Sequence, residues 1–336
     1  MEPRSRIDAF GATSLVGFSF VLAVNQVVIH LMNEGVQPVF FAGVRSALAA
    51  AVIAAVMLAQ GRSPRLERAV LGPGLLIGLL FAAEFVCLFL ALDLTGVTRV
   101  SVIFYSMPVW LSLMAHFLLP GERMGALKAL GLALAFAGVA WAILARDGAS
   151  AGEGSLAGDL LALGAAWGWA GVALCARATR LRAARPETQL LWQVAVSAPV
   201  LLLLAPLFGP VLREPEPWHL AGGAFQVALA SVGFLFWFRL LSIYPASGVA
   251  SFSFLAPVFG VGLGWLLLGE SVGLPLLGAA ALVAVGLVLV NRPAGAPAAI
   301  PLPPDPVAVP LPPEPKPPQV PQKVAATTSS GAGGRA

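Results

Sequence analysis

Charged side chains are scarce in this chain. They make up 11% of its 336 residues, and 58% of the residues are hydrophobic. Soluble domains carry about 25% charged residues, and the mean hydropathy here is +0.88. This composition excludes most soluble enzymes, disordered scaffolds and coiled coils, and it predicts an integral membrane protein.

Residues that bind metals or form cross-links are also few. Cys87 and Cys175 both lie within apolar runs, so we expect neither a disulfide framework nor a metal site. His30 and His116 have no second histidine or cysteine at metal-binding spacing. The basic residues lie in short loops between apolar runs, which excludes a nucleic-acid partner. No GxxxxGK[ST], GxSxG or HExxH pattern occurs, so we expect neither an enzyme nor a bound cofactor.

Long apolar runs fill most of the chain. A helix that crosses a bilayer needs about 20 mostly apolar residues. Ten runs of about this length occur, and none alternates with a period of two, which favours helices over a barrel. The sequence therefore predicts an all-α integral membrane protein with ten transmembrane helices. The runs are Phe10–Leu31, Val36–Ala59, Val70–Leu92, Val97–Leu119, Gly125–Ala145, Ala157–Thr179, Thr188–Phe208, Trp218–Leu241, Ala246–Leu268 and Leu274–Val290.

The loop charges predict the orientation of the chain. Basic residues concentrate in cytoplasmic loops. With residues 1–9 in the cytoplasm, the inner segments hold 13 Lys and Arg residues and the outer loops hold three. Both termini are then cytoplasmic, which agrees with an even number of spans. The many Ala, Gly and Arg residues are typical of a high-GC bacterial gene, so we expect the inner membrane of a bacterium.

The composition changes abruptly after the last run. Residues 293–321 contain 13 of the 28 prolines. Such a segment cannot form a helix or bury a core, so residues 292–336 are predicted to be a disordered cytoplasmic tail. A spacer is the simpler interpretation of this tail, and docking to a proline-binding module is the alternative.

The chain contains an internal repeat. VTRVSVIFYSMPVW at 97–110 aligns with ASGVASFSFLAPVF at 246–259. Segments 10–145 and 157–291 therefore form two halves of five spans each. Because five is odd, the second half enters the membrane inverted. Inverted repeats of this kind are typical of secondary transporters.

The repeat pairs four individual residues. Pro108 aligns with Pro257, and each interrupts the hydrogen-bond ladder of a predicted span. These prolines are candidate hinges or cavity-lining kinks, and packing kinks are the alternative. Glu122 aligns with Glu270, and each follows a glycine at the start of a span. A carboxylate in the first helical turn is stabilised by the helix dipole, so we interpret both glutamates as structural caps.

Both halves contain similar sequence motifs. The second half reads ASVGFLFWFRLL at 230–241 and YPASGVASFSFLAPVFGVGLGWLLLGES at 244–271. The first half contains related motifs, FLALDLTGVTRVSVIFYSMPVW at 89–110 and LPGERMGALKALGLALAFAGVAW at 119–141. In addition, Arg45 lies early in span 2. These segments resemble the EamA family of the drug/metabolite transporter superfamily.

The resemblance implies two inverted five-helix repeats and transport of small metabolites, usually outward. It also implies a central cavity lined by spans 1, 3, 4, 6, 8 and 9. Phe20 stands where many members have tryptophan, and Asp93 stands where a basic or polar residue is common. These departures bear on the substrate rather than on the fold.

Polar side chains from six spans lie near the predicted midplane. At about 1.5 Å per residue they lie roughly 9–18 Å from the outer end of their spans. Ionisable residues at this depth are costly and mark functional sites by default. They are the candidates for substrate binding, coupling or gating. The six residues are Asn25, Arg45, Glu84, Tyr105, Trp169 and Gln226.

Each candidate has a structural alternative. Glu84 could exchange a proton or bind an amino group of the substrate, or it could form a fixed ion pair with Arg45. Arg45 is favoured as a structural residue. Asn25 and Gln226 could bind substrate or a neighbouring helix. Tyr105 and Trp169 could present their aromatic rings to a cation, or their rings could pack against neighbouring helices.

The sequence favours a secondary transporter that exports small metabolites, amino acids or amphiphilic drugs by alternating access. Glu84 makes proton coupling compatible with this prediction. A channel or a lipid flippase is the alternative, and an intramembrane enzyme is less favoured. Partners are then a small-molecule substrate and membrane lipid. Small residues such as Gly260 and Gly264 suit close helix contact; they define no specific dimer interface, and a homodimer is compatible with the sequence. Asp93 and Arg99 are expected to be solvated helix ends.

Overall fold

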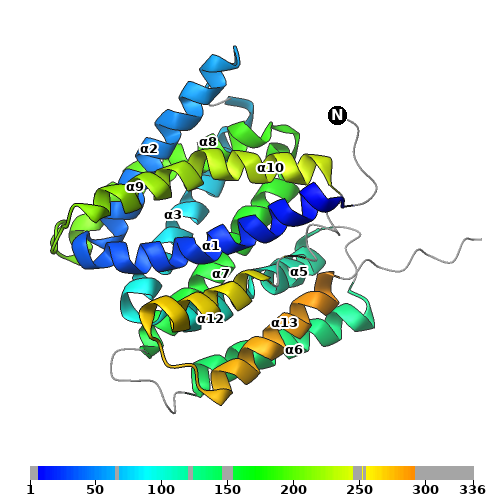
Figure 1. The fold of residues 1–336 in the computed structure, drawn as a ribbon. Coiled ribbons are helices and arrows are strands. Elements are labelled where there is room, and N and C mark those ends of the chain that lie inside the picture. Colours follow the sequence, from blue (N-terminus) through cyan, green and yellow to red (C-terminus); the bar gives the residue numbers. More distant parts are fainter. Residues whose placement is uncertain are drawn as a thin grey trace, which may run out of the picture. The chain divides into compact units, whose positions relative to one another are not determined.

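A computed structural model describes residues 7–64, 68–119, 124–145, 154–244, 252 and 255–291, and all statements below concern these residues (Figure 1). They form helices joined by short connections. The one β-type pairing among them is an isolated antiparallel bridge between Val36 and Leu212. Glu122 lies outside the described residues, as does the proline-rich tail.

The first half contains six helices, because its fourth span is broken in two. A 3₁₀ turn, η1 (Arg68–Val70), leads into the third span. The helices are α1 (Ala9–Gly35), α2 (Pro38–Ala59), α3 (Leu71–Leu94), α4 (Val97–Phe104), α5 (Met107–Leu118) and α6 (Ala126–Leu144).

The second half is organised similarly, with an irregular eighth span. Its helices are α7 (Leu156–Ala178), α8 (Pro186–Leu204), α9 (Trp218–Ala228), α10 (Phe234–Ile243), α12 (Leu255–Leu268) and α13 (Leu274–Asn291). Three shorter elements connect or extend them. They are the 3₁₀ turns η2 (Arg180–Ala183) and η3 (Ala205–Phe208), and the π-helical segment η4 (Leu229–Gly233).

The prediction of an all-helical membrane protein is confirmed. Nine helical segments within the described ranges are long and apolar enough to cross a bilayer. The remaining predicted span, Ala246–Leu268, coincides with the shorter apolar helix α12. Because residues 245–251 and 253–254 are outside the described ranges, the count of ten spans stays a prediction.

The two halves begin with equivalent helix caps. Asp8 precedes α1, and its Oδ1 accepts a hydrogen bond from the Gly11 amide at 2.8 Å. Ser155 precedes α7, and its hydroxyl accepts from the Gly158 amide at 3.4 Å. Such caps satisfy amide groups that a helix leaves without internal partners. The offset of 147 residues between the two caps is that of the repeat.

The repeat also appears as a pair of tertiary contacts. Gly11 lies against the ring of Tyr244, so closely that a Cβ would approach its Cζ to 2.6 Å. Gly158 lies against Thr95, where a Cβ would approach the Thr95 Cβ to 2.7 Å. Tyr244 and Thr95 occupy matching positions in the two halves. The halves therefore exchange equivalent contacts, each placing its first helix against a residue of the other half.

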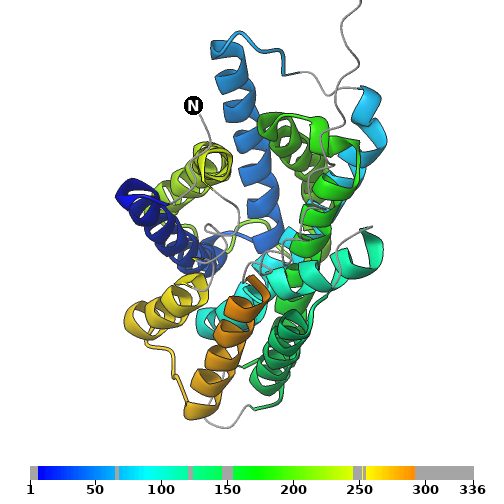
Figure 2. The same ribbon diagram turned by 90° about the vertical axis from the view of Figure 1, so that its right-hand side faces the viewer.

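The last helices of the two halves pack tightly along their small residues. Figures 1 and 2 show α6 and α13 side by side. A Cβ at Gly131 would lie 2.8 Å from the Gly286 carbonyl oxygen, and one at Gly138 would lie 2.7 Å from the Ala279 carbonyl oxygen. These contacts match each other across the repeat. Close backbone approach through small residues is the usual way for helices to associate in lipid.

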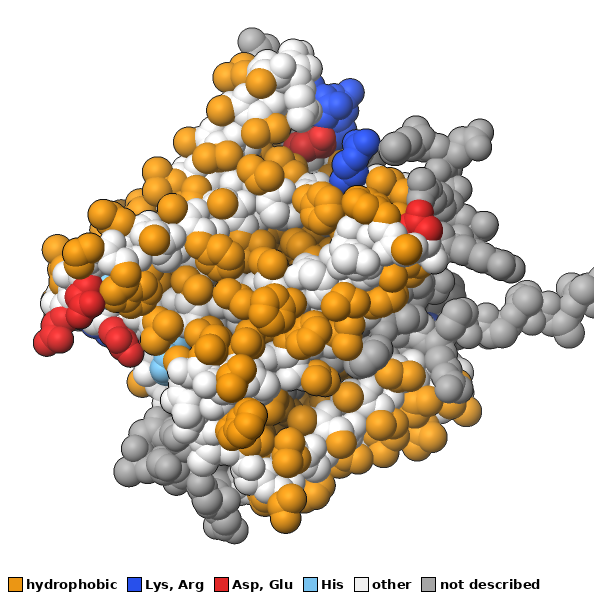
Figure 3. Space-filling view, in the orientation of Figure 1, with side chains coloured by type: hydrophobic (Ala, Val, Ile, Leu, Met, Phe, Trp, Pro, Cys, Tyr) orange, Lys and Arg blue, Asp and Glu red, His pale blue; other side chains and the backbone are white. Residues whose placement is uncertain are grey.

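The surface of this helical unit is suited to lipid. Figure 3 shows hydrophobic side chains spread over the visible helices, with the charged side chains gathered towards two margins of the view. Large apolar residues such as Leu203, Leu220 and Leu274 are about four-fifths exposed. Patches of this extent are rare on soluble monomers. The exposed apolar surface therefore agrees with a multi-pass membrane protein.

Candidate functional site

Arg45 and Glu84 are buried between neighbouring helices. Arg45 on α2 is 3% exposed and Glu84 on α3 is 2% exposed. Gly168 on α7 permits α3 to pack this closely, since a Cβ there would lie 2.9 Å from the Glu84 Cα. The Arg45 guanidinium lies over the Phe85 ring, 4.0 Å from its centroid. Stacking on an aromatic ring stabilises a desolvated cation.

The fixed ion pair between these two residues is not formed in this structure. Within the described ranges, no hydrogen bond or ion pair within 4 Å joins Arg45 to Glu84, although their charges are close enough to attract. Arg45 Nε and Glu84 Oε2 are buried without a hydrogen-bond partner among those residues. Unsatisfied buried charges are costly, so both groups retain the capacity to bind a polar ligand.

Asn25 and Gln226 meet between α1 and α9. The Gln226 side-chain amide donates to the Asn25 carbonyl oxygen at 3.3 Å. Two further acceptors, Gln226 Oε1 and Asn25 Oδ1, are buried and find no donor in the described part of the chain. The structure thus brings together two residues that the sequence had placed at similar depth, and leaves acceptor capacity on both.

Gln26 and Ser46 are site residues that the sequence reasoning missed. Gln26 Oε1 accepts from the Ser101 hydroxyl at 2.5 Å, whereas its Nε2 is buried without an acceptor among the described residues. Ser46 follows Arg45, and its buried hydroxyl also lacks a described partner. Both could have been found from the sequence, because Gln26 follows Asn25 and Ser46 follows Arg45, and both of those residues are predicted site residues.

Two of the spans that carry these polar side chains are irregular. The α9 helix passes into the π segment Leu229–Gly233 three residues after Gln226. Short π segments inside α-helices often occur at functional sites. The fourth span breaks at Tyr105 and Ser106, and Pro108 lies in the first turn of α5. The interruption expected at Pro108 is therefore located two residues before it.

The other predicted positions are less connected. Tyr105 is buried beside the Phe104 ring, and Trp169 packs against the apolar core on α7. Within the described residues, no hydrogen bond joins Tyr105 or Trp169 to Glu84 or Gln226. Pro257 is the third residue of α12, and the residues just before that helix are not described, so its effect on the ladder stays a prediction.

Glu270 caps a different helix from the one expected. It precedes α13 by four residues, and its carboxylate accepts from the Val97 amide at 2.6 Å and the Thr98 amide at 2.7 Å. These are the first two residues of α4, in the other half of the chain. Gly269 makes this possible, because its φ of 66° turns the chain sharply after α12. The expectation of a cap on its own span was wrong.

Arg99 is a buried residue rather than the solvated end that the sequence suggested. It lies on α4, and its guanidinium donates to Asp159 of α7 at 2.6 and 3.1 Å. The same guanidinium donates to the Ala142 and Ala145 carbonyl oxygens at the end of α6, at 2.5 and 3.4 Å. The Asp159 side chain is fully buried. Asp159 was missed because an acidic residue near a predicted helix start is usually solvated.

Asp93 is also paired, at the margin of the same region. Arg213 donates to both Asp93 carboxylate oxygens, at 2.6 and 2.9 Å. These hydrogen bonds raise the pKa of the Arg213 guanidinium above its usual value. Arg213 also donates to the Asn33 carbonyl oxygen at 2.7 Å. The loop before α9 is thereby tied to the ends of α1 and α3.

The described residues contain no group of three or more His, Cys, Asp or Glu side chains placed to hold a metal. Long apolar helices in two related halves, surrounding buried polar side chains, define a multi-pass membrane protein. A family model for the EamA-like transporter family matches residues 9–144 and 156–292. The chain belongs to this family, and it is a membrane transporter by that membership.

Two curated proteins of Bacillus subtilis (strain 168) are similar over most of their length. The uncharacterized transporter YvbV is 29% identical over 265 residues, which cover 76% of this chain and 82% of YvbV. The uncharacterized transporter YoaV is 22% identical over 278 residues, covering 82% of this chain and 94% of YoaV. One crystal structure is similar with a TM-score of 0.57 at 22% identity, covering 83% of this chain and 96% of the other. That likeness concerns the fold alone.

Proposed function

We propose that this chain is a secondary transporter that moves small polar or amphiphilic organic solutes, such as metabolites, amino acids or drugs, by alternating access. The observation that carries the proposal is the set of buried polar atoms without described partners on α1, α2, α3 and α9. A substrate that supplies those hydrogen bonds recovers their desolvation cost on binding. The set includes donors and acceptors, one cation and one carboxyl group, which suits a solute with several polar groups.

In this proposal, the conformational change that alternates access between the two sides of the membrane involves a movement of α4. Its amino-terminal end is held by Glu270 and, through Arg99, by Asp159, and both acids belong to the second half. The break at Tyr105 separates this short helix from α5, so α4 can move with little change in the rest of its span. We assign the two acidic contacts to closure of the side expected to face outward. The matching positions in the repeat are Gly248 for Arg99 and Ala12 for Asp159, so the opposite side lacks this ion pair.

A counterflow assay tests the transport proposal. The purified protein is reconstituted into liposomes, which are loaded with unlabelled amino acids or common metabolites. The same solute in labelled form is added outside, and its entry is measured. Saturable exchange of at least one solute is expected, with loss of exchange in Glu84→Gln and Gln226→Leu. Gln60→Ala, an exposed change at the end of α2, is the matched control and should transport normally. Full activity in Glu84→Gln would remove Glu84 from the mechanism, and lipid scrambling without solute exchange would replace the transporter proposal with a flippase.

A further inference from the structure

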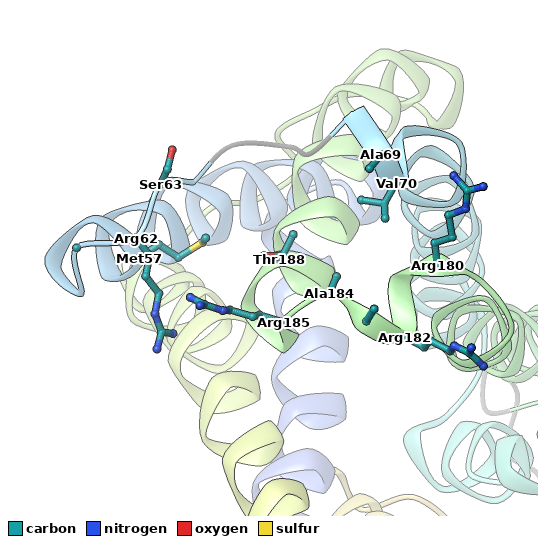
Figure 4. Close-up of a pocket in the computed structure, with 12 residues that line it drawn as sticks. Met57, Arg62, Ser63, Ala69, Val70, Arg180, Arg182, Ala184, Arg185 and Thr188 are labelled. Carbon is teal, nitrogen blue, oxygen red and sulfur yellow. The ribbon is translucent and has the colours of Figure 1, made fainter.

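An open pocket of about 820 Å³ lies where α2 ends and α8 begins, and none of the candidate site residues described above lines it. One part of its lining is apolar and includes Met57, Val70 and Ala184. Another part is strongly basic. Figure 4 shows Arg62 and Arg185 towards one side of the view and Arg180 and Arg182 towards the other, with Thr188 and Ala184 between them. The pocket therefore combines a basic rim with apolar walls.

Among the described residues, most of the positive charge in this pocket is not neutralised by an acidic side chain. Arg62 forms an ion pair with Glu187 at 2.6 Å. No such pair with a described acidic residue involves the other three lining arginines, Arg180, Arg182 and Arg185. Arg185 is also the N-cap of α8, a helix of 19 residues that presents the positive end of its dipole here. The described lining residues thus carry a net positive charge that an anion would balance.

We propose that this pocket binds the phosphate group of an anionic phospholipid. Arginine suits this ligand because its planar guanidinium makes paired hydrogen bonds to phosphate oxygens. Basic pockets between transmembrane helices on the cytoplasmic side are known to bind lipid head groups. The apolar part of the lining favours a lipid over free phosphate, and Leu58, which follows the lining residue Met57 on α2, is an exposed apolar residue. An acyl chain can lie along that helix while the phosphate contacts the arginines.

A lipid in this pocket would contact elements from both halves of the chain. The pocket joins the end of α2 and the 3₁₀ turn η1 in the first half to η2 and α8 in the second. A bound lipid would hold these four elements together at the side expected to face the cytoplasm. Anionic lipid should therefore stabilise the folded protein, whereas a zwitterionic lipid of the same chain length should not.

The test measures thermal unfolding of the full chain in detergent during titration with phosphatidylglycerol, phosphatidylcholine or inorganic phosphate. A rise in the unfolding temperature with phosphatidylglycerol alone is expected. The triple variant R180Q/R182Q/R185Q should bind phosphatidylglycerol roughly a hundredfold more weakly, at about fivefold per arginine near a lipid surface. Arg239→Gln, an exposed basic residue on α10 outside the pocket, is the matched control and should keep the full effect.

Each contrary result has a distinct meaning. Equal stabilisation by inorganic phosphate would overturn the lipid as ligand and leave a free-anion site. Retained phosphatidylglycerol binding in the triple variant would overturn the pocket itself. All three substituted arginines are exposed, so the lipid-free unfolding temperature should match that of the natural protein, and this measurement separates lost binding from misfolding.

Discussion

The Arg99–Asp159 pair is the sharpest place to perturb this protein. Asp159→Asn keeps the shape of the side chain but leaves the Arg99 guanidinium buried without its counter-ion. Both side chains are at least 94% buried, and the shortest separation between them is 2.6 Å. Removing one partner of a buried pair costs about 3–5 kcal/mol, because the remaining charge stays desolvated. Folded domains are stable by only about 5–15 kcal/mol, so the loss should be large.

The assay is equilibrium unfolding of the purified protein in mixed micelles, followed by intrinsic tryptophan fluorescence. Asp93→Asn is the matched control, because Asp93 also pairs with an arginine at 2.6 Å but that arginine is 32% exposed. An exposed pair contributes about 0.2–1 kcal/mol. The double variant R99M/D159L should recover much of the lost stability, since an apolar pair needs no counter-ion. If Asp159→Asn were no more destabilising than Asp93→Asn, the assignment of a buried structural pair would be refuted.

Three further predictions concern other close contacts. Gly168→Leu should separate α3 from α7 beside Glu84, lowering the stability by about 1–3 kcal/mol through overpacking and abolishing exchange in the counterflow assay. Glu270→Ala should remove the acceptor for two α4 amides and destabilise the protein by about 1–2 kcal/mol, while Glu270→Gln keeps one acceptor and should cost less; equal losses would contradict the cap. Tyr244→Phe should cost about 1–2 kcal/mol because the tyrosine hydroxyl donates to Asp8 at 2.7 Å, and unchanged thermal unfolding would show that this bond contributes nothing.

The membrane-spanning helices were predictable because their cause is local. Backbone groups in lipid must be satisfied within each segment, so a run of apolar residues of sufficient length is itself the signal for a helix. The break before Pro108 was also readable, since proline removes a donor from its own helix. The repeat is visible in the sequence as two segments that align. The structure shows in addition that the two halves make equivalent contacts, Gly11 with Tyr244 and Gly158 with Thr95.

The candidate site was predictable only in part. Depth alone identifies the six midplane residues as candidates, and among these six described residues a hydrogen bond joins only Gln226 to Asn25. Depth does not give the direction of a side chain around its helix. Arg45 and Glu84 accordingly match in depth without forming a hydrogen bond in the described structure, because the guanidinium stacks on Phe85 instead.

What the sequence determined by itself is the class of protein: apolar helices in two related halves, with few charges left inside. What only the tertiary structure decided is where those charges act. Asp159 lies 60 residues from Arg99, and Glu270 lies 173 residues from the Val97 amide that it caps. A charged residue near a helix end looks solvated in the sequence, and only the packing of distant helices around it removes the water and supplies its partner.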